Sequence, residues 1–117
     1  MATSVLIVDD HPSFRATARL LLEAEGYEVV GEAPDGLSGI TAALDLRPDL
    51  VLLDVNLPDI DGFDVAARLT NGNGPTVVLV SSRDSSDFGP LVARSGARGF
   101  ISKGELSGAA LAALLER

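Results

Sequence analysis

Residues 50–64 read LVLLDVNLPDIDGFD, and this stretch decides how the rest of the chain is interpreted. The four apolar residues at 50–53 are typical of a buried strand, yet the run ends in a carboxylate at Asp54. Three further acidic residues follow within ten positions, at 59, 61 and 64. A strand that leads directly into acidic residues indicates either a turn or a site that needs carboxylates.

Strand-like and helix-like patterns alternate on both sides of this stretch. The expected strands are residues 5–8, 28–32, 50–53, 76–80 and 99–102, and the expected helices are residues 12–25, 37–47, 63–69, part of 86–95, and 105–117. The fourth helix has the weakest pattern, because Gly89 and Pro90 either interrupt it or mark its first turn. Apolar strands separated by helices predict an α/β fold of three layers, with helices on both faces of a parallel sheet.

Composition and charge limit the classes of function. A length of 117 residues with 46% hydrophobic content predicts one domain over residues 1–117. The net charge of −8 repels phosphate backbones and anionic lipids, so we expect no direct binding to nucleic acid or membranes. The first apolar run ends at Val8 and no basic segment precedes it, which favours a cytoplasmic location. The absence of cysteine excludes disulfides and thiolate sites.

The polar residues that follow the expected strands predict a site at one edge of the sheet, because ligands of open parallel sheets bind beyond the carboxyl ends of the strands. These residues are Asp9, Asp10, Asp54, Ser81, Ser82, Ser102 and Lys103. Crowded carboxylates repel one another unless a cation compensates them. Oxygen ligands, with no histidine or cysteine expected nearby, favour Mg²⁺ over Zn²⁺. A carboxylate, a metal ion and a lysine together indicate phosphoryl transfer to Asp54.

Four motifs in order resemble the receiver domain of two-component response regulators. They are Asp9-Asp10, LLDVNLPDIDGF at 52–63, VVLVSS at 77–82 and GFISK at 99–103, and together they span almost the whole chain. The resemblance implies a doubly wound, flavodoxin-like (βα)5 fold with strand order 2-1-3-4-5. It also implies a signalling phosphoacceptor that catalyses only its own phosphorylation and slow dephosphorylation.

The resemblance assigns roles to the metal ligands and the acceptor. Asp54 would take a phosphoryl group from the phosphohistidine of a histidine kinase or a histidine phosphotransfer protein. Asp10 and Asp54 would bind Mg²⁺, Asp9 would act largely through water, and Asn56 would add its backbone carbonyl.

The resemblance also implies how phosphorylation is read out. Ser81, Ser82 and Lys103 would contact the phosphoryl group, and the rotamer of Phe100 would follow the movement of Ser81. The face formed by the fourth helix, fifth strand and fifth helix would then bind a partner or a second copy of the chain. Arg83, together with Asn56, would tune the lifetime of the phosphoryl group.

Two features bear on the subfamily. Gly104 follows Lys103, where many receivers have a proline with a cis bond. Receivers that share this feature and the DDHP motif at 9–12 often precede a helix-turn-helix output domain in transcription regulators. No such domain is expected within the 117 residues, so the chain is either a stand-alone receiver or a fragment.

Other classes fit the residues less well. A haloacid-dehalogenase-type phosphatase needs a second acid two residues after its nucleophile, and Asn56 stands there. A calcium-binding loop with Gly62 at position six would place Leu57 and Arg68 at the first and last ligand positions. No glycine-rich turn follows the first strand, which argues against dinucleotide binding.

Several of the polar residues also have ordinary structural interpretations. Asp9 and Asp10 could cap the first helix, and His11 is expected to be an exposed residue at its start. Asp59 and Asp61 are expected to serve the turn, with one of them helping to start the third helix.

Overall fold

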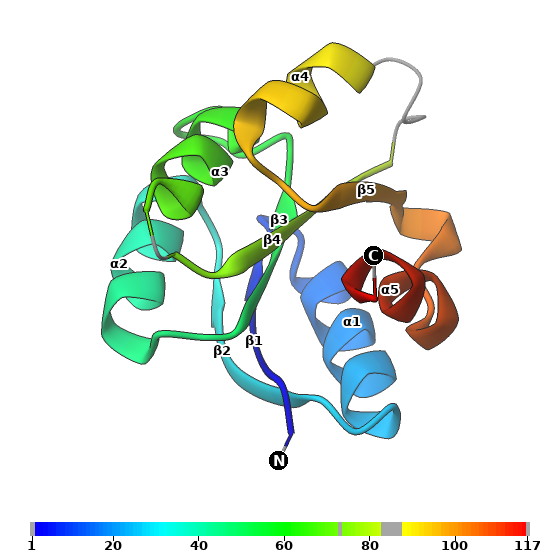
Figure 1. Ribbon diagram of the computed structural model, residues 1–117. Helices are drawn as coiled ribbons and strands as arrows, with labels where there is room; N and C mark the ends of the chain where they lie inside the picture. The colour runs from blue at the N-terminus through cyan, green and yellow to red at the C-terminus, as the bar shows by residue number, and fades with distance from the viewer. Residues whose placement is uncertain (1, 73, 83–87, 117) are drawn as a thin grey trace.

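A five-stranded parallel sheet forms the centre of the computed structural model, which describes residues 2–72, 74–82 and 88–116. Its strands are β1 (Ser4–Val8), β2 (Glu28–Ala33), β3 (Leu50–Asp54), β4 (Thr76–Ser81) and β5 (Gly99–Ser102). They lie in the order β2-β1-β3-β4-β5 (Figure 1). The predicted α/β class and strand order 2-1-3-4-5 are therefore confirmed.

Helices cover both faces of the sheet, as Figure 1 shows. The helices α1 (Pro12–Ala24) and α5 (Gly108–Leu115) lie on one face, and α2 (Gly36–Leu46), α3 (Gly62–Thr70) and α4 (Gly89–Ser95) lie on the other. Among the described residues, no helix is both long and apolar enough to span a membrane.

The core is divided into two layers by the alternation of side chains along each strand. In β3, for example, Val51 and Leu53 pack under α2 and α3, whereas Leu50 and Leu52 pack with α1 and α5. All five residues of β3 are buried, because this strand lies at the middle of the sheet. The apolar run that ends at Asp54 is therefore the centre of the core.

Helix boundaries follow local capping. The side chains of Asp35, Asp61 and Ser107 accept backbone N–H groups at the starts of α2, α3 and α5. The predicted role of Asp61 in starting the third helix is confirmed. Pro90 lies in the first turn of α4, which decides between the two interpretations of this residue.

The start of the fifth helix was predicted wrongly. The sequence pattern favoured a helix over 105–117, but α5 begins only at Gly108. Residues Lys103–Glu105 form a short 3₁₀ turn instead, closed by the Leu106 N–H on the Lys103 carbonyl at 3.4 Å. Ser107 is extended and caps α5, so the helix cannot start before it.

Candidate functional site

Three strands bring the acidic residues and the lysine to one edge of the sheet. Asp9 directly follows β1, Asp54 is the last residue of β3, and Lys103 directly follows β5. Asp54 still belongs to the strand ladder, where it pairs with Val80 of β4. The predicted convergence of Asp9, Asp54 and Lys103 is present in the structure.

Lys103 bridges the two buried carboxylates. Its Nζ lies 2.7 Å from Asp9 Oδ2 and 3.4 Å from Asp54 Oδ2. The same Nζ lies 4.5 Å from the centroid of the Phe14 ring on α1, within the range of a cation–π contact. Sequence reasoning did not identify Phe14 as part of the site. The ring restricts where the ammonium group lies, so α1 helps to aim Lys103 at the carboxylates.

Asp54 is a carboxylate in an almost fully enclosed position, with 2% of its surface exposed. One oxygen, Oδ1, accepts the N–H of Asn56 at 3.2 Å. The pKa of Asp54 is raised from 3.8 to about 6 by the sum of several effects. Burial is the largest and raises the pKa, as does the charge of Asp9, whereas the hydrogen bond from the Asn56 amide and the charge of Lys103 lower it. The positive groups around Asp54 therefore do not fully compensate the cost of burying its charged form.

His11 joins the acidic cluster, so the expectation that no histidine lies nearby was wrong. Its Nδ1 lies 3.1 Å from Asp9 Oδ1 and 3.1 Å from Asp10 Oδ1. As the N-cap residue of α1, His11 has an extended backbone, with φ −97° and ψ 108°. Its ring is 61% exposed, as expected for a residue at a helix start, but it lies against the carboxylates of Asp9 and Asp10.

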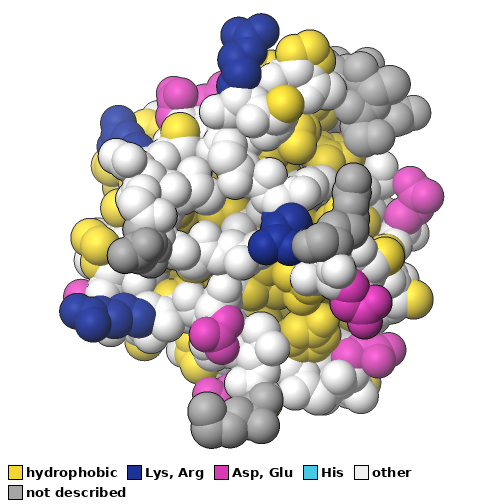
Figure 2. All heavy atoms as spheres, viewed as in Figure 1, with side chains coloured by type: hydrophobic (Ala, Val, Ile, Leu, Met, Phe, Trp, Pro, Cys, Tyr) yellow, Lys and Arg dark blue, Asp and Glu magenta, His cyan; other side chains and the backbone are white. Residues whose placement is uncertain are grey.

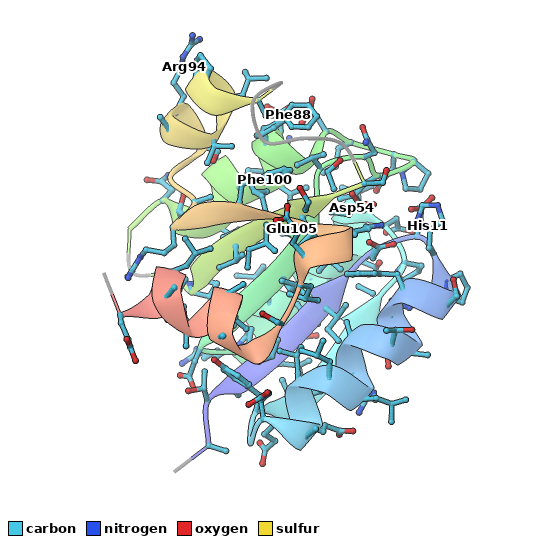
Figure 3. All side chains as sticks on the ribbon, turned by 90° about the vertical axis from the view of Figure 1, so that its right-hand side faces the viewer. His11, Asp54, Phe88, Arg94, Phe100 and Glu105 are labelled. Atoms are coloured by element: carbon cyan, nitrogen blue, oxygen red, sulfur yellow. The ribbon has the colours of Figure 1, made fainter. Side chains whose placement is uncertain are left out.

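The carboxylates fit a divalent cation. Oxygen or nitrogen atoms of Asp9, Asp10, His11 and Asp54 all lie within 4.8 Å of one another. Asp9 Oδ2 and Asp10 Oδ1 are buried atoms that form no hydrogen bond with the described residues, but Asp9 Oδ2 lies 2.7 Å from Lys103 Nζ and Asp10 Oδ1 lies 3.1 Å from His11 Nδ1. Clustered carboxylate oxygens are suitable ligands for a hard cation such as Mg²⁺. Figure 3 shows His11 and Asp54 at the same end of the sheet.

The predicted switch residues lie along the neighbouring strands. Ser81 is fully buried at the end of β4 and pairs in register with Ser102 of β5, whereas Ser82 is exposed beyond the strand. Arg83 falls outside the described residues.

Phe100 is part of an aromatic row that sequence reasoning did not find. Its ring centroid lies 5.8 Å from that of Phe88, which in turn lies 5.5 Å from that of Phe63 on α3. Phe88 is the N-cap residue of α4 (Figure 3). A rotation of Phe100 would therefore change contacts at the start of α4.

Two residues, Arg15 and Asp59, support the neighbouring loops through polar contacts. Arg15 Nη1 donates to the Asp9 carbonyl at 2.6 Å, and Arg15 Nε donates to Glu32 Oε1 at 3.1 Å. Asp59 accepts the N–H groups of Gly36 and Leu37, each at 2.8 Å, so the loop after β3 caps α2. Asp59 was expected to serve its own turn or the start of the third helix. Its partners lie more than twenty residues away, and no local pattern identifies them.

The family model for the response regulator receiver domain matches residues 5–115. A Pseudomonas aeruginosa protein named as a transcriptional regulator is 46% identical over 104 residues, covering 88% of this chain and 50% of that protein. BvgA of Bordetella pertussis, named as a positive transcription regulator of virulence factors, is 43% identical over 106 residues, covering 90% of this chain and 51% of BvgA.

The fold has a close match among solved structures. The signal receiver domain of NarL from Mycobacterium tuberculosis superimposes with a TM-score of 0.85 at 34% identity, covering 99% of this chain and 98% of that one. The chain spans about half the length of the curated relatives that it matches.

Proposed function

The chain belongs to the response regulator receiver domain family, and from this premise we propose that Asp54 accepts a phosphoryl group from the phosphohistidine of a histidine kinase or a histidine phosphotransfer protein. The observation that carries the proposal is the position of Asp54. It is a buried carboxylate at the end of the central strand, with Lys103 Nζ at 3.4 Å and the acidic cluster within 4.8 Å.

In the proposed transfer, an oxygen of Asp54 attacks the phosphorus atom. A phosphorus–oxygen bond forms, the phosphorus–nitrogen bond of the phosphohistidine breaks, and the electron pair leaves with the imidazole. Lys103 stays between Asp9 and Asp54 and places a positive charge beside the phosphoryl oxygens. Ser81 and Ser82 are the proposed hydroxyl contacts of the same group.

The proposed metal ligands are Asp10, Asp54 and the backbone carbonyl of Asn56, with Asp9 acting largely through water. When bound, Mg²⁺ neutralises the charge that carboxylate and phosphoryl oxygens bring together. Carboxylate oxygens of Asp9, Asp10 and Asp54 lie within 4.8 Å of one another, close enough to share one cation. They come together because β1 and β3 are adjacent in the sheet.

The proposed output starts from the added charge of about −1.5 to −2 that a phosphoryl group carries. A hydrogen bond from Ser81 to a phosphoryl oxygen would draw the end of β4 inward, and Phe100 would turn into the vacated space. Because Phe100 packs on Phe88, that rotation would reach α4 and change the face of α4, β5 and α5. We propose this face as the site of partner binding or self-association.

The transcription regulators among the relatives suggest the wider role. We propose that this receiver controls an output domain of that kind through the α4, β5 and α5 face. We expect the receiver itself not to bind nucleic acid directly. The net charge is −8, and on the face shown in Figure 2 the Lys and Arg side chains lie apart from one another.

Labelling with a small phosphodonor tests the proposal. With acetyl phosphate and Mg²⁺, we expect intact mass spectrometry to show one added phosphoryl group on the wild type and none on Asp54→Asn. Asp64→Asn, an exposed change in the first turn of α3, is the matched control and should label like the wild type. Labelling of Asp54→Asn at the wild-type level would refute the assignment. Catalytic release of phosphate from a simple phosphomonoester would favour a phosphatase instead.

A further inference from the structure

Arg15 on α1 connects the loop after β1 to the edge strand β2. Its Nη1 donates to the backbone carbonyl of Asp9 at 2.6 Å, and its Nε donates to Glu32 Oε1 at 3.1 Å. The Arg15 side chain is 18% exposed, so most of it lies inside the structure. The planar fork of a guanidinium group can hold two acceptors in a fixed arrangement, which a single ammonium group cannot do as well.

The backbone of Asp9 is held to β2 at both of its polar groups. The Asp9 N–H donates to the Ala33 carbonyl at 3.0 Å, and the Asp9 carbonyl reaches β2 through Arg15 and Glu32. The Asp9 carbonyl and the Asp10 N–H belong to one planar peptide group, so a hydrogen bond on the carbonyl also restricts the orientation of that N–H. Arg15 therefore restricts the backbone from which the carboxylates of Asp9 and Asp10 project.

Packing of α1 against β2 does not by itself explain the contact with Asp9. Arg19, one turn further along α1, already binds the other oxygen of Glu32, with 2.7 Å between Nε and Oε2. Among the described residues, Arg19 makes no hydrogen bond or ion pair with the loop after β1. The pKa of Glu32 is lowered, most by the hydrogen bond from Arg19, so Glu32 stays charged and can hold Arg15 as well. Of the two arginines, only Arg15 joins Glu32 to the loop.

We propose that Arg15 is a positioning residue of the proposed Mg²⁺ site, because it holds the loop after β1 in the conformation that brings the carboxylates of Asp9 and Asp10 to the ion. The inference rests on the proposed function for the identity of the ion, but it concerns binding and does not require phosphorylation. Loss of a positive charge near the site would by itself strengthen the binding of a cation. Loss of positioning weakens that binding, so the two effects have opposite signs.

The first test measures Mg²⁺ affinity in the chain of 117 residues by titration, followed through amide NMR shifts. Arg15→Met removes both donors and the charge, whereas Arg15→Lys keeps the charge and loses the fork. We expect the Kd for Mg²⁺ to rise about tenfold in both variants, as happens when groups that orient metal ligands are removed. Arg19→Met, which removes the other arginine bound to Glu32, is the matched control and should bind Mg²⁺ like the wild type.

The second test uses acetyl phosphate labelling of Asp54 at increasing Mg²⁺ concentration. In Arg15→Met we expect the Mg²⁺ concentration for half-maximal rate to rise about tenfold. The rate at saturating Mg²⁺ should stay close to that of the wild type, because the bound ion itself draws the loop into place. In metal-free NMR spectra the amide of Asp10 should shift in Arg15→Met and not in Arg19→Met.

Four results would overturn the proposal. They are a Kd in Arg15→Met equal to or below that of the wild type, a wild-type Kd in Arg15→Lys, an equal weakening in Arg19→Met, and amide shift changes that spread through β3 and β4 in Arg15→Met. If Asp54 is labelled but Mg²⁺ affinity does not depend on Arg15, the proposed function stands and this inference fails. If Mg²⁺ affinity depends on Arg15 but Asp54 is not labelled, the inference stands and the proposed function fails.

Discussion

Replacing the proposed phosphoacceptor should stabilise the metal-free protein at neutral pH. Asp54 is buried in a place where its charged form is poorly compensated, and its pKa is raised to about 6. Asp54→Asn has nearly the same shape but carries no charge. We therefore expect the variant to unfold at a higher urea concentration than the wild type in the presence of a chelator at pH 7.

The size of the effect follows from the pKa. The value rises from 3.8 in an ordinary environment to about 6 in the folded chain. Because one pKa unit corresponds to about 1.4 kcal/mol, ionised Asp54 destabilises the folded state by about 3 kcal/mol at pH 7. The direction of the pH dependence follows because the pKa of Asp54 is higher in the folded chain than in the unfolded chain. The folded state binds the proton more tightly, so stability is lost as the pH rises from about 4 through 6 and is retained below 4.

The assay is urea unfolding of the wild type and Asp54→Asn at pH 4 and pH 7 with EDTA, followed by circular dichroism. We expect the difference in the free energy of unfolding to be about 3 kcal/mol at pH 7 and below about 1 kcal/mol at pH 4. Glu28→Gln removes one charge from an exposed position and should show neither difference. Added Mg²⁺ should narrow the difference at pH 7, because it stabilises the folded wild type.

Two results would refute this reasoning. Equal stability of the two chains at pH 7 would mean that the buried carboxylate is compensated by groups other than Lys103 and the Asn56 amide. A difference of the same size at pH 4 and pH 7 would mean that the change acts through packing, since ionisation of Asp54 is then not involved.

Two other substitutions have definite expected outcomes. A β-carbon at Gly62 would collide with the backbone at Asp54 and Val55, so Gly62→Ala should destabilise the chain by about 1–3 kcal/mol in urea unfolding; Gly104→Ala, where a β-carbon meets nothing within 4 Å, is the control and should be close to neutral. With beryllium fluoride as a phosphoryl mimic, Ser81→Ala should lose the amide NMR shifts that the wild type shows over residues 88–103, and shifts like those of the wild type would remove Ser81 from the switch.

The sequence was most informative where one strand decides both fold and site. The buried run at 50–53 predicted the central strand, and the residues after the strands predicted the edge at which Asp9, Asp54 and Lys103 meet. Periodicity gave the α/β class, but the strand order came only from family resemblance. The fold class and the location of the site could be predicted because both depend on the order of residues along the chain. Neither depends on the orientation of individual side chains.

The remaining features depend on orientations that a linear pattern does not contain. His11 was expected at the surface, and its ring is exposed, but its Nδ1 lies against two carboxylates. The capping of α2 by Asp59 and the contact of Lys103 with Phe14 join segments far apart in the chain. The fifth helix starts late because Ser107 caps it, whereas the apolar pattern alone favoured an earlier start.

The balance of charge at the sheet edge connects these observations. Asp9 has support from Lys103 at 2.7 Å, from the His11 amide, and from Arg15 on its backbone carbonyl. Among the described residues, Asp54 has only the Asn56 amide and the more distant Lys103 as stabilising partners. The unfavourable energy is therefore concentrated on the residue proposed to react. A bound cation compensates this charge, so the affinity for the metal and the instability of the metal-free chain have the same physical origin. A substitution that removes the buried charge should therefore both stabilise the metal-free chain and weaken metal binding.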